Sequence, residues 1–282
     1  MAKIGIVSDT TCDVPKEYID KLNIITVPLS IIFGKESFRD DGIEITTEQF
    51  YEKLKQTESL PTTAQPSPGD FIKTYENILK DHDGIISIHI SKKMSGTIAS
   101  AEMAKKEFDQ DKINIIDSEL VHMPLGFLVM KAAELANEGK DADEIVKGVM
   151  DFKSKLKVLF VPSTLEYLKK GGRIGRSKAL LASLLEIKPI LTLNLGEVSP
   201  FKNTRRWNQA KTELINSMDS MIDNPSDMVV SICDSDNKPD RDELGERIKN
   251  KFNPKKMILG DIGAIVGTHL GPGGIGITFY EE

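Results

Sequence analysis

Small polar residues follow three of the apolar runs that the sequence predicts to be buried strands. Ser8–Thr10, Ser91–Thr97 and Asp117–Ser118 each come directly after such a run. In an open parallel sheet, ligands bind outside the carboxyl ends of the strands. Ser95–Thr97, with glycine in the middle, opens a helix, and a helix start offers free N–H groups and partial positive charge to an anion. This pattern is suited to a carboxylate or phosphate site, while the simpler interpretation is that Ser95 only caps its own helix, since serine is among the commonest N-cap residues.

Two further segments carry candidate ligand contacts. Thr62 and Thr63 stand between prolines in Leu60–Pro68, which the prolines predict to be a loop, either for recognition or as a structural turn. Gly267–Gly274 has four glycines in eight positions, which indicates a tight backbone path or close ligand approach. Inside it, His269 can contact a ligand or simply satisfy a local hydrogen bond. The spacing of the other histidines predicts no metal site.

Basic residues and glycines alternate in Lys169–Arg176, around Arg173, and further basic residues follow at Lys202, Arg205 and Arg206. Glycine beside basic residues can wrap an anion or phosphoryl group. A helix C-cap, with lysine at the end and glycine beyond it, explains the same residues and is compatible with that role. The sequence lacks a P-loop, GxGxxG after the first strand, HExxH and GxSxG. We therefore assign no catalytic residue and expect no cofactor.

Length and composition describe an ordinary globular chain. Its 282 residues exceed one comfortable core, so two domains are expected. The net charge of −6 argues against a sequence-independent nucleic-acid binder, which needs a basic surface. The N-terminus runs straight into a strand, and no apolar run reaches the ~18 residues of a membrane helix. Two isolated cysteines, Cys12 and Cys233, fit small buried side chains in a reducing compartment. We expect a cytoplasmic protein without membrane insertion.

The elements that must position these residues differ between the two halves of the chain. Apolar strands alternate with helices up to about Lys153, which predicts an α/β domain with a mainly parallel sheet over residues 1–154. Residues 155–282 predict an α+β domain with a mixed or antiparallel sheet, including a hairpin at Leu195–Glu197. The predicted strands are Lys3–Val7, Asn23–Phe33, Gly84–Ile90, Lys112–Asp117, Lys157–Val161, Pro189–Asn194, Val198–Lys202, Met228–Cys233, Lys256–Asp261 and Gly274–Tyr280.

Helices are predicted between these strands, and two of them are apolar on nearly every side. Met123–Leu135 and Ala179–Ile187 are therefore expected to be buried in a core or to line an apolar cavity, with core packing the simpler interpretation. The first predicted helix begins near Pro15. The others span about Thr46–Lys55, Gly69–Leu79, Thr97–Phe108, Met123–Asn137, Asp141–Lys153, Thr164–Lys170, Ser177–Glu186, Thr204–Ile222 and Asp240–Phe252.

Taken together in this order, four motifs resemble the DegV family over essentially the whole chain. They are Pro61–Pro66, Ser91–Thr97 with its Ser-Gly-Thr ending, Leu168–Ile174 and His269–Gly273. The resemblance implies a carrier, not an enzyme, that holds one long-chain fatty acid between the two domains. It also implies that this carrier presents the carboxylate to a separate ATP-dependent subunit of bacterial fatty-acid kinase and then carries the acyl-phosphate.

The resemblance further implies residue roles. Thr63 (with Thr62), Ser95 with the Gly96 backbone, and His269 would hold the carboxylate, Arg173 would lie near it, and Arg205 would contact the kinase subunit. Ala64 and Trp207–Gln209 depart from the family pattern, which tends to have serine at the first and more basic residues at the second. The alternatives are an enzyme acting on a small phosphorylated metabolite, and a regulatory or structural protein without a ligand.

Overall fold

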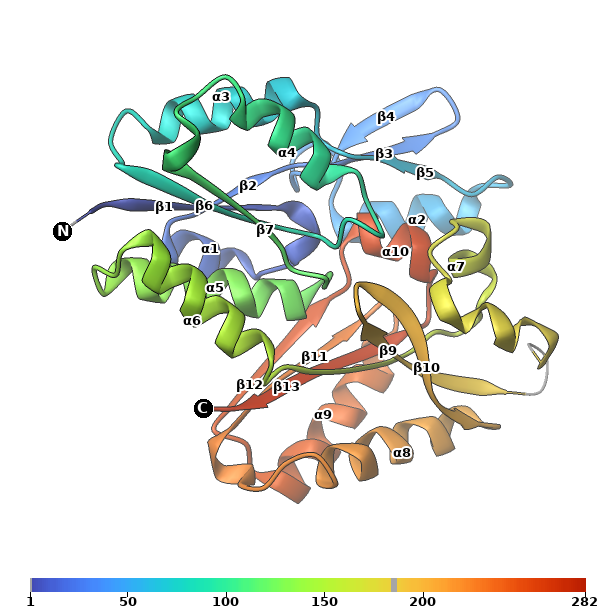
Figure 1. Cartoon of the computed structure of the whole chain (residues 1–282). Helices are drawn as coiled ribbons and strands as arrows, with labels where there is room; N and C mark the ends of the chain where they lie inside the picture. Colours follow the sequence, from blue (N-terminus) through green and yellow to red (C-terminus); the bar gives the residue numbers. More distant parts are fainter. Residues whose placement is uncertain (1, 184–186) are drawn as a thin grey trace. The chain divides into compact units, whose positions relative to one another are not determined.

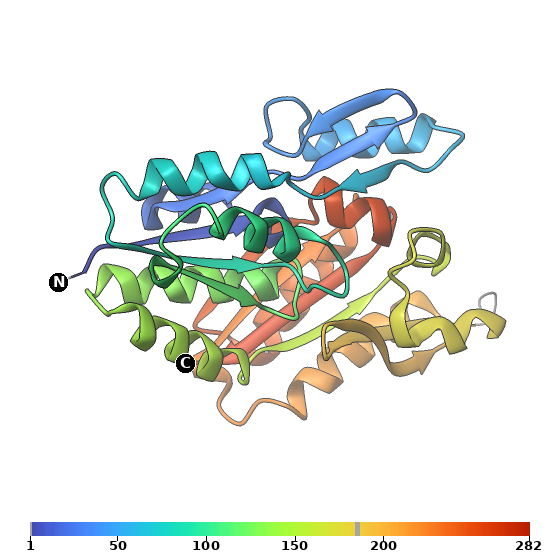
Figure 2. The ribbon, with the colours of Figure 1, turned by 45° about the horizontal axis from the view of Figure 1, so that its top comes forward.

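The structure is a computed structural model that describes residues 2–183 and 187–282. The chain forms two compact units. The first contains the chain up to Thr46 together with Glu58–Ser154, and the second contains Thr47–Thr57 together with the chain from Lys155 onward. Each unit has its own central sheet (Figures 1 and 2). Among the described helices, none has the length and apolar character needed to cross a bilayer.

The first unit is built on a parallel sheet in the order β2-β1-β6-β7. Every residue of β6 is buried, as expected for a strand covered on both faces, and such strands read as continuous apolar runs. The predicted parallel sheet is therefore confirmed. The strand bounds are β1 Ile4–Asp9, β2 Ile24–Val27, β6 Gly84–His89 and β7 Ile113–Asp117.

Helices cover both faces of this sheet. Figures 1 and 2 show α3 and α4 on one face and α1, α5 and α6 on the other. On the α3 side, Phe71 and Tyr75 pack against Val7 and Ile85. Helix α5 has the predicted bounds, and ten of its fifteen residues are buried, which explains its apolar character on nearly every side. The helix bounds are α1 Lys16–Leu22, α3 Pro68–Ile78, α4 Thr97–Lys105, α5 Met123–Asn137 and α6 Ala142–Lys153, with the short 3-10 helices η1 Thr10–Cys12 and η2 Gln110–Lys112.

A small antiparallel sheet, in the order β4-β3-β5, corrects two predictions. The single strand predicted over Asn23–Phe33 is divided at Pro28, whose missing N–H cannot join a ladder, so β2 and β3 belong to different sheets. The predicted loop at Leu60–Pro68 contains β5, because its prolines flank the strand and do not interrupt it. The bounds are β3 Ser30–Phe33, β4 Glu36–Arg39, which the sequence did not predict, and β5 Thr62–Ala64.

The second unit is built on a six-stranded mixed sheet in the order β10-β9-β8-β13-β11-β12. Strands β11 and β12 are parallel and the other neighbours are antiparallel, which confirms the predicted α+β class. The predicted hairpin joins β9 to β10, and Leu195 and Gly196 both have positive φ, as a type I′ turn requires. The bounds are β8 Lys157–Val161, β9 Lys188–Asn194, β10 Glu197–Thr204, β11 Met228–Asp234, β12 Lys256–Asp261 and β13 Ile275–Glu281.

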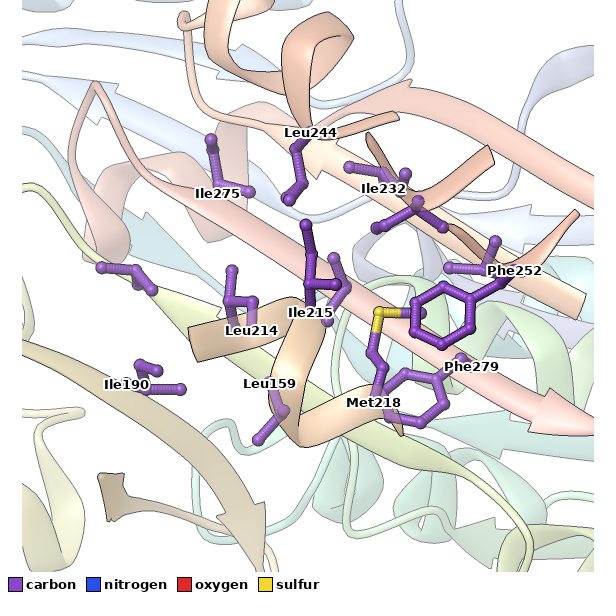
Figure 3. Close-up of a cluster of buried hydrophobic side chains, with 14 of the residues drawn as sticks. Leu159, Ile190, Leu214, Ile215, Met218, Ile232, Leu244, Phe252, Ile275 and Phe279 are labelled. Carbon is purple, nitrogen blue, oxygen red and sulfur yellow. The ribbon is translucent and has the colours of Figure 1, made fainter. Parts of the chain in front are cut away.

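Helices α8 and α9 cover one face of this sheet. Leu214 and Met218 of α8 and Leu244 of α9 pack with Ile232 and Phe279 of the strands (Figure 3). Near the chain end, α10 lies where the sequence predicted only a glycine-rich path. The predicted helix over residues 177–186 is a 3-10 helix, and residues 184–186 lie outside the described part. The bounds are α2 Thr47–Gln56, α7 Glu166–Lys170, η3 Gly175–Ser183, α8 Trp207–Asp219, η4 Pro225–Asp227, α9 Lys238–Phe252 and α10 Ala264–Leu270.

Candidate functional site

Two of the predicted motifs meet within the first unit. Thr62 and Thr63 lie on β5, where Thr62 is exposed and Thr63 is partly buried. Beyond this strand, the Gln65 side chain crosses to α4, and its Nε2 donates to Ser100 Oγ at 3.4 Å. It also lies directly over Gly96, where a Cβ atom would overlap the Gln65 carboxamide. The threonine strand and the start of α4 are therefore neighbours, an adjacency that the sequence did not reveal.

The start of α4 has the features of an anion site, although Ser95 is also engaged locally. Gly96 occupies the N-cap position, not Ser95. The Thr97 N–H donates to Ser95 Oγ at 3.3 Å, and the hydroxyls of Ser95 and Thr97 are 2.8 Å apart. Thr97 is fully buried, whereas Ser95 is only partly buried. A serine that accepts from the helix start can still donate its own hydroxyl hydrogen to a carboxylate, so the local role and the binding role are compatible.

In the second unit, His269 and Arg173 are held at the facing ends of α10 and α7. His269 lies in the last turn of α10 and so is helical, not part of the predicted glycine-rich path. Its ring lies against Gly171, where a Cβ atom would overlap Nδ1. Arg173 follows two residues later, and its Nη1 donates to the Gly171 carbonyl at 2.6 Å. The two sequence motifs that contain these residues therefore form one cluster.

The backbone around Arg173 follows a helix-ending pattern. Gly172 has φ of +72°, the Gly172 N–H donates to Lys169 O at 3.1 Å, and the Arg173 N–H donates to Leu168 O at 3.0 Å. These two bonds make a Schellman motif, which satisfies carbonyls at the end of α7. The C-cap interpretation of this segment is thus confirmed, and the same turn fixes where the Arg173 side chain begins.

His269 is electrostatically unusual. Burial, which penalises the imidazolium, lowers its pKa to about 4, and the nearby charge of Arg173 acts in the same direction. The ring is therefore neutral at pH 7 and offers one N–H donor. A neutral imidazole can donate a hydrogen bond to a carboxylate. When the ligand leaves, the ring adds no buried charge of its own to the site.

This pKa predicts a pH dependence of stability. Between pH 6.5 and about 4 the unfolded chain protonates this histidine while the folded chain does not. The contribution of the neutral His269 ring to the free energy of unfolding is therefore complete above pH 6.5 and is lost as the pH falls toward 4. From pH 7 to pH 5 the wild type should lose on the order of 1–2 kcal/mol more unfolding free energy than His269→Gln. Urea unfolding at both pH values measures this difference, and parallel losses in the two proteins would contradict it.

A buried polar network in the first unit was missed by sequence analysis. His89 Nδ1 lies 3.0 Å from Asp9 Oδ2, His89 Nε2 lies 2.6 Å from Ser87 Oγ, and Ser87 Oγ lies 2.9 Å from Tyr75 Oη. Asp9, Ser87 and His89 are completely buried, so none of these three side chains is open to solvent. The sequence did contain a sign of this network, because two polar residues at positions 87 and 89 of an apolar strand must lie on the same face of it.

The remaining predicted contact, Arg205, lies elsewhere in the second unit. It is exposed in the turn between β10 and α8, where its N–H donates to Gln209 Oε1 at 3.1 Å. Trp207 next to it is anchored, because Nε1 donates to Asp240 Oδ2 at 2.7 Å. Within residues 2–183 and 187–282, no three His, Cys, Asp or Glu side chains are grouped as a metal site would require.

Comparison with known proteins relates the whole chain to one family. A family model described as an uncharacterised protein of the DegV family matches residues 3–282. A DegV domain-containing protein of Halalkalibacterium halodurans is 33% identical over 283 residues and covers 100% of both chains. A structure described as fatty acid binding of a DegV family protein from Thermus thermophilus is 31% identical with a TM-score of 0.93, covering 100% of both chains. A stearic acid-binding protein from Eubacterium ventriosum is 25% identical with a TM-score of 0.88, covering 100% of this chain and 98% of that one.

Proposed function

The chain belongs to the DegV family, and from this premise we propose that it binds one long-chain fatty acid and carries it without catalysing a reaction itself. The observation that carries the proposal is the kind of donor in the two clusters. Each supplies groups suited to a carboxylate: hydroxyls at a helix start in one, and a neutral histidine beside an arginine in the other. Relatives described as fatty acid-binding and stearic acid-binding proteins support the same ligand class.

The head group sets the chemical requirement. An unpaired carboxylate is very costly to remove from water, so it needs several donors at once. In the proposal, Thr63 with Thr62, Ser95 and the Gly96 backbone act from the first unit, and His269 acts from the second, with Arg173 near the head group. In this proposal the ligand is held between the domains predicted over residues 1–154 and 155–282. Arg173 would become more important for an acyl-phosphate, which carries more negative charge.

The alkyl tail supplies the binding free energy. Burial of a methylene contributes ~0.8 kcal/mol, so ~14 methylenes contribute on the order of 11 kcal/mol before the costs of association. A short acid with the same head group lacks most of this term. Chain length is therefore the simplest test of whether the ligand is a lipid.

Ligand extraction tests the proposal. Native mass spectrometry of the purified protein should find a bound lipid of roughly 250–300 Da, the size of a drug-like ligand held in one enclosed site. Palmitate or oleate should raise the melting temperature strongly, and butyrate should not. If small phosphate esters stabilise the chain and long-chain acids do not, the carrier proposal fails and the alternative of an enzyme acting on a phosphorylated metabolite takes its place.

The finer part of the proposal is that an ATP-dependent kinase subunit phosphorylates the bound acid. Arg205 is exposed, and its bond to Gln209 is made by the backbone N–H and not by the side chain. The guanidinium is therefore in a position to contact a partner protein. Arg205→Glu should lower acyl-phosphate formation with such a subunit about tenfold, because a favourable charge contact becomes a repulsive one. Its fatty-acid affinity should stay at the wild-type value. Unchanged turnover by Arg205→Glu would remove this residue from the docking surface.

A further inference from the structure

Helix α2 lies in the second unit, but its neighbours in sequence belong to the first. Thr47–Thr57 is assigned to the second unit, whereas the chain up to Thr46 and from Glu58 belongs to the first. The chain therefore leaves the first unit, forms α2, and returns to the first unit to form β5. Residues 57–61 alone connect the end of α2 to the strand that carries Thr62 and Thr63.

Helix α2 contacts both α10 and the segment that leads into it, and part of this contact is polar. The Tyr51 hydroxyl donates to the Ile262 carbonyl at 2.9 Å, and both groups are buried. The rings of Phe50 and Tyr51 meet edge to face at 4.9 Å. Both lie over Gly267, where a Cβ atom would come within 2.9 Å of Phe50 Cε1 and would overlap the Tyr51 hydroxyl. Figure 1 shows the two helices side by side.

This contact lies close in sequence to proposed binding residues on each of its two sides. On α10, Gly267 precedes His269 by only two residues, so the surface that receives Tyr51 belongs to the same helical turn as the histidine. On the other side, the connection from α2 to β5 is short and ends in Pro61, whose ring fixes φ. Residues 57–61 therefore tie Thr62 covalently to the helix that carries Tyr51.

We propose that Tyr51 is a positioning residue for the carboxylate site, acting by seating α2 in the Gly267 notch of α10. The proposal rests on the proposed fatty-acid function and goes beyond it, since Tyr51 itself need not touch the ligand. Hydrogen bonding to a carboxylate depends steeply on donor position, whereas burial of an alkyl tail is non-directional. Loosening α2 should therefore weaken head-group recognition and leave tail binding intact.

The test compares palmitate with hexadecanol, which has the same chain length and no carboxylate, by displacement of a fluorescent fatty-acid probe. Tyr51→Phe removes the hydroxyl that bonds to Ile262 and keeps the ring, and it should weaken palmitate binding about two- to fivefold, the upper value being what one lost hydrogen bond can transmit to the ligand. Hexadecanol affinity should not change. Tyr75→Phe is the matched control, because it removes an equally buried hydroxyl, 2.9 Å from Ser87 Oγ, in the core of the first unit. It should leave both affinities unchanged.

The outcomes separate the inference from the function on which it rests. An equal loss for both ligands in Tyr51→Phe, or a similar loss of palmitate affinity in Tyr75→Phe, would mean a general structural role and would overturn the positioning role. Unchanged palmitate binding in Tyr51→Phe would overturn it too. If the wild type itself binds palmitate no better than hexadecanol, the carboxylate proposal fails first and the inference fails with it.

Discussion

The double variant Thr63→Val/Ser95→Ala should be purified without fatty acid while its fold survives. Each substitution removes one hydroxyl donor to a charged group, and such a bond contributes about 1.5–3 kcal/mol. Losing both should weaken binding by about 10²–10⁴-fold. The folded chain should tolerate the change, because Thr63 and Ser95 are only partly buried and valine suits the β5 strand. Native mass spectrometry and palmitate titration measure the loss, and thermal melting of the lipid-free proteins checks the fold.

A control for this variant makes the same two chemical changes elsewhere in the first unit. In Thr74→Val/Ser154→Ala, each lost hydroxyl donates to a backbone carbonyl near it in sequence, Asp70 O at 2.9 Å and Asp151 O at 2.7 Å. This protein should keep its fatty acid. If mass spectrometry finds stoichiometric acid on Thr63→Val/Ser95→Ala as well, these hydroxyls do not hold the head group and the assignment is wrong.

Gly271→Ala should strongly destabilise the second unit. Gly271 ends α10 with φ of +78° and ψ of 172°, a region that is essentially restricted to glycine. A Cβ atom there would also lie 2.6 Å from Cγ and 2.7 Å from Cε2 of Tyr167, whose ring cannot move away as a flexible side-chain end would. Backbone strain and overpacking each cost about 1–3 kcal/mol, so the unfolding free energy should fall by ~2–6 kcal/mol.

Gly172→Ala provides the matched comparison for this prediction. Gly172 has a similar φ of +72°, but its Cβ position has no heavy atom within 4 Å. Gly172→Ala should therefore lower the free energy of unfolding by only about 1–2 kcal/mol, the cost of an alanine in the left-handed region. Trp207 is the single tryptophan and packs against the core of the second unit, so its fluorescence in urea follows the unit that contains both glycines. Equal destabilisation by the two alanines would show that the Tyr167 contact does not restrict residue 271.

The sequence predicted most elements because their signals are local. Helix α5 begins and ends where its apolar pattern predicted, with Pro124 in its first turn and Gly139 at positive φ just beyond it. The Leu195–Gly196 turn carried a hairpin signal of its own. The errors arose where neighbours in space decide. Strand β5 depends on pairing with β3, and helix α10 runs into a stretch for which the glycines predicted only a tight backbone path or close ligand approach.

By itself, the sequence determined the fold class, the family and the types of residue available to bind an anion, since periodicity and motif order are read along the chain. Only the tertiary structure decided which of them are neighbours: Gln65 over Gly96, His269 against Gly171, and Tyr51 over Gly267. Each pair joins segments far apart in sequence, and each depends on a glycine that leaves room for a side chain. Such contacts arise from close packing in three dimensions, because a side chain of one segment occupies the space that a Cβ atom would take at a glycine of another segment.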